Sequence, residues 1–202
     1  MPPGFRFAFS LLIILATSMV QADDPAPTMR RFVFSEAHMG TKFKILLYGP
    51  NQATANQTAA AAYARIAQLN KILSDYDEDS EVRRLCTTSG RGNSVSVSQP
   101  LFKVLVSAQR LSANSDGAFD ATAGPLIVLW RKARRTKQKP ADNAIEAAMN
   151  AVGYSHMQLK SPDRVILNQT KMRIDLGGIA KGYAADEALR ILSQAGIKSA
   201  LV

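Results

Sequence analysis

Residues 173–186, RIDLGGIAKGYAAD, have the composition of a ligand-binding turn between a strand and a helix. Gly177 and Gly178 lack a Cβ atom, so backbone groups there can approach a ligand closely. The N-terminus of the following helix carries partial positive charge and free N–H groups, which favour an anion such as phosphate. Lys181 lies in the first helical turn, where a bound anion would offset its unfavourable interaction with the helix dipole. An ordinary glycine-containing turn with a surface lysine is the alternative, because no P-loop or GxGxxG pattern is present.

Asp120 is the second candidate, in a loop of small residues expected between two helices at 116–126. It follows the aromatic Phe119 and precedes Thr122 by two positions. Asp and Thr at this spacing can cap the helix that follows, which would be a structural role. Alternatively, the carboxylate and neighbouring backbone groups receive a polar heterocycle. The residues themselves leave both alternatives open.

Met39 and Tyr76 form the third candidate, a pair of side chains that could sandwich a flat ring system. Met39 lies in the stretch His38-Met39-Gly40-Thr41, and Tyr76 is the single aromatic residue of an acidic segment at 75–81. Aromatic and thioether side chains make favourable contacts with flat rings. Taken alone, such residues are more often part of a core or a surface.

Short strands and helices must bring these candidates together. Alternating apolar residues predict two strands with a tight connection over 31–48, and an alanine-rich apolar face predicts a helix over 53–73. Ser98 is expected to cap a helix over 101–111. We also expect helices at 126–130, from Asp142 to Gly153 and at 179–195, a strand at 95–97, and a hairpin of 165–167 with 172–175. This order indicates an α+β fold with interleaved short strands and helices.

The first 22 residues predict a signal peptide. Arg6 precedes an apolar run at 7–20, and small residues stand at the −3 and −1 positions before Asp23. The run is shorter than the roughly 20 apolar residues that span a bilayer comfortably. We therefore expect a cleavable signal peptide at 1–22, a proline-containing linker at 23–30 and a folded domain at 31–202, in a protein exported to the bacterial periplasm. A buried N-terminal helix is the alternative.

The composition excludes several classes of protein. With 47% hydrophobic and 20% charged residues, the 202-residue chain is globular rather than disordered. A single cysteine, Cys86, excludes an intrachain disulfide and a multi-cysteine zinc or iron–sulfur site.

Much of the net charge of +9 comes from residues 131–139, because six of these nine residues are basic. We interpret this run as a solvated loop that follows the helix ending at Trp130. Docking of an acidic partner protein, or peripheral contact with the inner membrane, is the alternative. No aromatic residues interleave with the charges, so nucleic-acid binding is not expected.

Four segments together resemble the ApbE family of FAD:protein FMN transferases, once called thiamine-biosynthesis lipoproteins. Each motif is weak alone, but all four occur in the family's order and spacing. They are Met39-Gly40-Thr41; LSDY at 73–76 with Ser80-Glu81; GAFDAT at 117–122 with Gly124-Pro125-Leu126 and Trp130; and IDLGGIAKGYAAD at 174–186. The resemblance covers the chain from Phe32 onward and implies the α+β fold of these flavin transferases, truncated at the C-terminus.

The resemblance implies an exported, Mg²⁺-dependent enzyme that transfers FMN from FAD to a threonine of an acceptor flavoprotein and releases AMP. It also implies roles for particular residues. Met39 and Tyr76 would contact the isoalloxazine ring; Ala118, Phe119 and Asp120 would line the flavin; Asp175 and Lys181 would hold the FAD; and the backbone carbonyl of Gly178 would be a Mg²⁺ ligand.

Other parts of the family pattern are not found in these 202 residues. The resemblance places an Asn-x-Gly-Gly-Asp-like turn, a His-containing motif, and the Asp and Thr ligands of Mg²⁺ after Val202. We therefore expect the catalytic residues there, and this stretch alone to be inactive, because one carbonyl cannot supply the six oxygens that Mg²⁺ prefers. Cys86 stands where the family commonly has Asn.

Two rival functions follow from the same resemblance. One is an FAD pyrophosphatase, in which water replaces the threonine hydroxyl. The other is a non-catalytic periplasmic FAD-binding protein.

Overall fold

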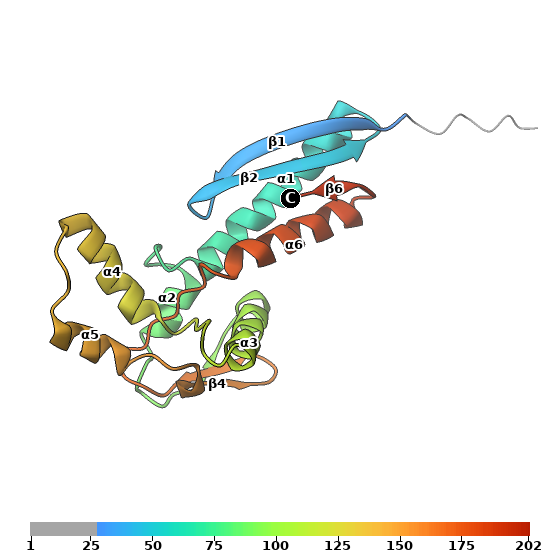
Figure 1. Cartoon of the computed structure of the whole chain (residues 1–202). Helices are drawn as coiled ribbons and strands as arrows, with labels where there is room; N and C mark the ends of the chain where they lie inside the picture. Colours follow the sequence, from blue (N-terminus) through green and yellow to red (C-terminus); the bar gives the residue numbers. More distant parts are fainter. Residues whose placement is uncertain (1–27) are drawn as a thin grey trace, which may run out of the picture.

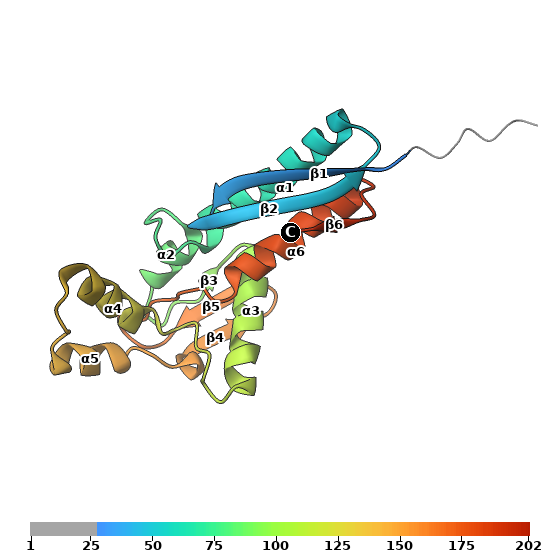
Figure 2. The same cartoon turned by 45° about the horizontal axis from the view of Figure 1, so that its top comes forward.

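The computed structural model describes residues 28–202, which form two layers of secondary structure (Figure 1). The proposed signal peptide and most of the linker lie outside the described residues. The first layer contains two long helices and an antiparallel sheet in the order β1 (Arg30–His38), β2 (Thr41–Gly49) and β6 (Ala200–Leu201). The long helices α1 (Gln52–Leu73) and α6 (Ala180–Gln194) lie side by side beneath it (Figures 1 and 2).

The second layer contains a smaller antiparallel sheet and four helices. The sheet has the order β3 (Val95–Ser96), β5 (Arg164–Leu167) and β4 (Met157–Lys160), and α3 packs beside β4. A 3-10 turn, η1 (Tyr154–His156), precedes β4. The four helices are α2 (Glu81–Cys86), α3 (Gln99–Asn114), α4 (Gly124–Thr136) and α5 (Asp142–Met149). Helices α4 and α5 pack on each other at one end of the molecule (Figure 2).

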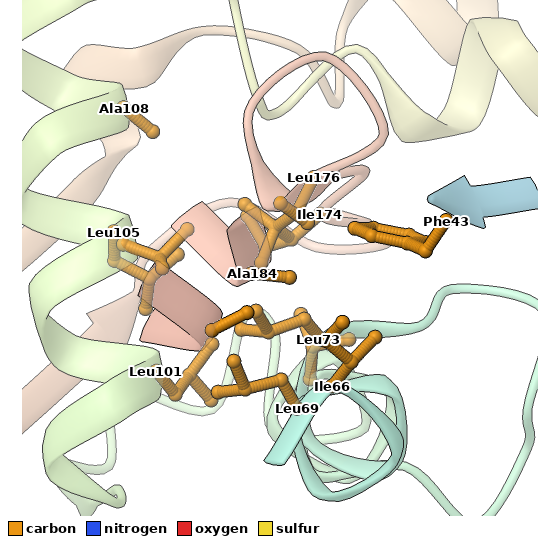
Figure 3. Packing of buried hydrophobic residues seen from close by; sticks show 14 of the residues in the cluster. Phe43, Ile66, Leu69, Leu73, Leu101, Leu105, Ala108, Ile174, Leu176 and Ala184 are labelled. Atoms are coloured by element: carbon orange, nitrogen blue, oxygen red, sulfur yellow. The ribbon is translucent and has the colours of Figure 1, made fainter. Parts of the chain in front are cut away.

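One continuous core joins the two layers. Figure 3 shows buried side chains from α1, α3, α6 and the segment before α6 meeting in it, among them Ile66, Leu69, Leu73, Leu101, Leu105, Ile174, Leu176 and Ala184. Ile174 and Leu176 are fully buried, so they anchor the residues between and after them. The turn that carries Asp175, Gly177 and Gly178 is therefore held by the core rather than by a free loop.

The turn between β1 and β2 has the predicted tight geometry. His38 pairs with Thr41, which leaves a two-residue loop of Met39 and Gly40 with φ angles of 51° and 70°. Positive φ at both positions is the type I′ geometry that matches the twist of the flanking strands. A methionine in this region is uncommon, because its Cβ is disfavoured there. The strand pair thus presents Met39 at its tip.

Two predicted elements were wrong. Residues 172–175 do not form a hairpin with 165–167: β5 pairs with β4 and β3, and Arg173 makes an isolated parallel bridge to Ala123. The alternation of apolar residues reflects burial of Met172, Ile174 and Leu176 between the layers, not a sheet. The helix that begins at Asp142 ends at Met149, and Gly153, at φ 145°, is not a left-handed cap.

None of the helices in 28–202 has the length and apolar character required for a membrane crossing.

An ion pair between the two long helices predicts a pH-dependent contribution to stability. Glu187 on α6 accepts hydrogen bonds from Arg190, at 3.0 Å, and from Arg65 on α1, at 2.8 Å. The bond from Arg190 lowers the pKa of Glu187; burial opposes this, and Arg65 lowers it further. Because the pKa of Glu187 in the folded state is below its ordinary value of 4.5, the ionised carboxylate stabilises the fold at pH values above 4.5. This stabilisation is lost as the pH falls through the lowered pKa.

Glu187→Gln should therefore lower the free energy of unfolding by about 1–2 kcal/mol at neutral pH. Below pH 4.5 the difference from wild type should shrink. Urea unfolding at both pH values measures this. Glu146→Gln, an exposed position on α5, is the matched control and should show no such trend. A Glu187→Gln deficit that is constant with pH would contradict the assigned ion pair.

Candidate functional site

A cavity of about 590 Å³ opens where three sequence motifs meet. Its walls are the β1–β2 turn with Met39, the segment after α1 with Tyr76, and the start of α6 with Gly177 and Lys181. Arg131 of α4 completes the lining. Three of the residues predicted to bind a ligand, Met39, Tyr76 and Lys181, thus face one space although they lie far apart in the sequence.

Tyr76 is placed for stacking rather than for stability. It is 75% exposed, so it contributes little to the core. The Arg131 guanidinium lies over one face of its ring, with Cζ 4.1 Å from the ring centroid, a cation–π arrangement. The second face of the ring has no such partner among residues 28–202 and is available to a flat ligand.

Arg131 corrects the interpretation of 131–139 as a solvated loop. Helix α4 continues to Thr136, and the Arg131 side chain turns inward to bond the carboxylates of Asp75 and Asp175, the latter at 2.7 Å. Both carboxylates are buried. Burial would lower the pKa of Arg131, but the hydrogen bond and charge of Asp75, together with Asp175, raise it. Arg131 therefore supplies the positive charge that balances the buried carboxylates of Asp75 and Asp175.

Asp175 holds the glycine turn in place. Its Oδ1 accepts from the backbone N–H of Gly177 at 2.8 Å, and Oδ2 accepts from Arg131. Lys181 Nζ donates to the carbonyl oxygen of Gly177 at 2.6 Å. Gly177 and Lys181 line the cavity directly, whereas Asp175 is buried and does not line it. Its role as an FAD-binding residue stays a prediction.

Asp120 braces its loop by hydrogen bonds. Its Oδ1 accepts from the N–H and the hydroxyl of Thr122, both at 2.7 Å, and Oδ2 accepts from the N–H of Tyr154 at 2.9 Å. Neither Asp120 nor Thr122 caps α4, whose N-cap is Ala123 without a side-chain bond. The structural alternative for Asp120 is therefore bracing of the loop, not capping of the helix.

Phe119 lies against Gly178, where a Cβ would stand 3.0 Å from its ring. Neither Ala118, Phe119 nor Asp120 lines the cavity directly. Their predicted flavin contacts stay predictions.

The residues of 28–202 do not assemble a Mg²⁺ shell. Among them, no group of three or more His, Cys, Asp or Glu side chains is placed to hold a metal ion. Gly178 is exposed, so its carbonyl is one available oxygen against the six that Mg²⁺ prefers. The described part of the chain therefore contains no complete Mg²⁺ site.

Cys86 is structural. It is buried, and its sulfur accepts from the N–H of Ile174 at 3.2 Å, which joins α2 to the segment before α6. Burial raises the pKa of the thiol; the bond from Ile174 opposes the rise. A buried thiol with a raised pKa is a poor nucleophile.

Arg131, Asp75 and Arg173 were missed as site residues by the sequence reasoning. Arg173 Nη2 donates to the carbonyl oxygen of Asp75 at 2.9 Å, so Arg131 and Arg173 both contact Asp75. A signal was available for Arg131: two acidic residues in the ligand motifs, Asp75 and Asp175, require a cation if they are buried. The apolar run before Arg131 also allowed the helix to continue.

The chain is similar to known flavin transferases. The sequence model of the ApbE family matches residues 39–202. An FAD:protein FMN transferase of Klebsiella pneumoniae (strain 342) is 30% identical over 174 residues, which cover 86% of this chain and 54% of the relative. One from Salmonella typhimurium is 28% identical over 172 residues, with 81% and 48% covered.

Solved structures agree with the sequence matches. The apo flavinyl transferase ApbE of Pseudomonas stutzeri superimposes with a TM-score of 0.75 at 28% identity and covers 85% of this chain and 54% of that one. The ApbE protein of Thermotoga maritima gives a TM-score of 0.74 at 26% identity, with 85% and 55% covered. The chain thus spans about half the length of these proteins. It belongs to the ApbE family and has the α+β fold of the ApbE flavin transferases.

Proposed function

We propose that the full-length protein is an FAD:protein FMN transferase. It would attach FMN from FAD to a threonine of an acceptor flavoprotein and release AMP. Family membership and the names of the relatives support flavin transfer in general. The observation that carries the proposal is the cavity that brings Met39, Tyr76 and Lys181 of three separate motifs to one space.

The size and lining of the cavity are those of a small-molecule site and support the proposal. Its volume of about 590 Å³ lies in the range of 300–1,000 Å³ that is usual for small-molecule pockets. Met39 and Tyr76 would contact the isoalloxazine ring, and Lys181 would face an anionic part of FAD. Bound FAD supplies the phosphoric anhydride that is cleaved: the threonine oxygen forms a bond to the FMN phosphorus while the bond to AMP breaks.

Mg²⁺ belongs to the proposal only as an expectation of the family. In this chain the Gly178 carbonyl is the proposed ligand, and residues 28–202 assemble no group of three or more His, Cys, Asp or Glu side chains that would supply the remaining oxygens. Removal of Mg²⁺ by a chelator should abolish transfer by the full-length protein.

Tyr76→Ala should weaken FAD binding by about 2 kcal/mol, because one stacking face is lost. The thermal stability should change little, since Tyr76 is 75% exposed. Flavin fluorescence titration of the full-length protein measures the affinity. Tyr48→Ala, a tyrosine on β2 that does not line the cavity, is the matched control. Equal affinities of wild type and Tyr76→Ala would exclude the stacking role.

Incubation of the full-length protein with FAD, Mg²⁺ and a threonine-bearing acceptor tests the activity. In-gel flavin fluorescence on the acceptor is the expected result. Free FMN and AMP without labelling would instead identify an FAD pyrophosphatase. Binding of FAD with no product would identify a non-catalytic FAD-binding protein.

We also propose that residues 1–22 direct export to the bacterial periplasm and are then removed. The apolar run at 7–20 and the small residues before Asp23 support this. N-terminal sequencing of the protein from a periplasmic fraction should begin at Asp23. An intact Met1 in the cytoplasmic fraction would overturn the proposal.

A further inference from the structure

A second cavity, of about 350 Å³, adjoins the 590 Å³ cavity proposed to bind the flavin, which we call the flavin cavity. Asp75, Tyr76 and Arg131 line both, so these three residues form the partition between them. Five of the residues that line the second cavity are basic: Arg83, Arg131, Lys132, Arg135 and Arg173. We call this second cavity the basic cleft.

The acidic residues of the basic cleft do not neutralise it. Its two acids are Asp75 and Glu78. Asp75 is already bonded to Arg131 and lies 4.0 Å from Arg173. Within 28–202, Arg83, Lys132 and Arg135 form no ion pair, so positive charge remains in excess.

Arg83 and Arg173 show the excess most clearly. The Nε atom of each is buried and lacks a hydrogen-bond partner in the described part of the chain. Burial lowers the pKa of Arg173, and the charge of Arg83 lowers it further, so the two guanidiniums repel each other. Asp75 offsets the repulsion between Arg83 and Arg173 only in part, and a bound anion would reduce its free-energy cost further.

We propose that the basic cleft is a binding site for an oxyanion, a phosphate or carboxylate group, beside the flavin cavity. Arg83 and Arg173 would bind the oxygens through their planar N–H groups, which match both chemistries. Lys132 and Arg135 on α4 would add charge at the rim. The group could belong to a small phosphorylated molecule or to an acidic peptide, and the two sources share this chemistry.

Isothermal titration calorimetry of the full-length protein, without FAD and at constant low ionic strength, tests the site. Inorganic phosphate and a hexaglutamate peptide are titrated separately. At least one probe should bind saturably. Arg83→Gln should weaken that binding about tenfold, the effect of one lost charge-assisted hydrogen bond. Arg135→Gln, which removes an exposed charge at the rim, should weaken it about threefold.

Arg110→Gln is the matched control: it removes the same charge from an exposed position on α3 that does not line the cleft. Its affinity should equal that of wild type. Binding of phosphate alone identifies a phosphoryl ligand, and binding of the peptide, with or without phosphate, identifies an acidic segment. Binding of neither probe, or equal binding by all variants, overturns the proposal. Should Arg83→Gln fail to fold, the exposed Arg135→Gln decides. None of these results depends on flavin transfer.

Discussion

Replacement of Arg131 by methionine is expected to lower the free energy of unfolding by about 3 kcal/mol. Methionine retains much of the side-chain volume but removes the positive charge. Asp175, whose side chain is 7% exposed, would then be a buried carboxylate without a cation, and the buried Asp75 would keep only Arg173, 4.0 Å away. Urea unfolding followed by circular dichroism measures the loss. FAD affinity should fall as well, because Arg131 packs on Tyr76.

A double-mutant cycle separates the ion pair from simple loss of packing. In the Arg131→Met background, Asp175→Asn should cost much less than in wild type, because it removes an unpaired charge. Arg131→Lys should be intermediate, since lysine keeps the charge but cannot bond both carboxylates through a planar fork. Additive effects of Arg131→Met and Asp175→Asn would show that the pair is not coupled.

Gly124→Ala is expected to destabilise the protein by about 3 kcal/mol through overpacking. Gly124 is buried at the start of α4, where a Cβ would overlap the carbonyl oxygen of Arg173 and stand 2.8 Å from its carbonyl carbon. Both obstacles are backbone atoms of the segment that leads to Asp175. The alanine must therefore push apart the α4 start and the glycine turn, and FAD affinity should fall with stability.

Gly182→Ala is the matched control, since Gly182 lies in α6 and, among the described residues beyond its own helical backbone and chain neighbours, no atom stands within 4 Å of its Cβ position. Alanine is a better helix former than glycine, so this variant should be neutral or more stable by up to about 1 kcal/mol. Thermal unfolding of both variants gives the comparison. A Gly124→Ala protein as stable as Gly182→Ala would contradict the close approach of α4 to residue 173.

Local signals were sufficient for the elements that carry a clear pattern. The β1–β2 hairpin, α1, α3 with its Ser98 cap, and α6 follow from periodicity and capping. Residues 172–175 were misassigned because alternation reports which side chains are buried and not what buries them. Here the burial comes from helices of both layers, a tertiary contact that no local window contains.

The residues of the candidate site were likewise predicted only in part from local signals. Met39, Tyr76 and Lys181 were predicted from motifs, and they line one cavity. Arg131 was assigned to a solvated loop because it opens a run, 131–139, in which six of the nine residues are basic. Its true environment depends on Asp75 and Asp175, which lie 56 and 44 positions away. A pairing over that distance is set by the fold of both layers and leaves no trace in the local composition.

A crystal structure of the full-length protein with bound FAD would show whether this cavity receives the flavin. The isoalloxazine ring should lie in contact with Met39 and on the face of Tyr76 opposite Arg131, with Lys181 near an anionic part of FAD. A ring bound elsewhere would exclude this cavity as the flavin site, and a Tyr76 side chain turned away from the ring would exclude the stacking role.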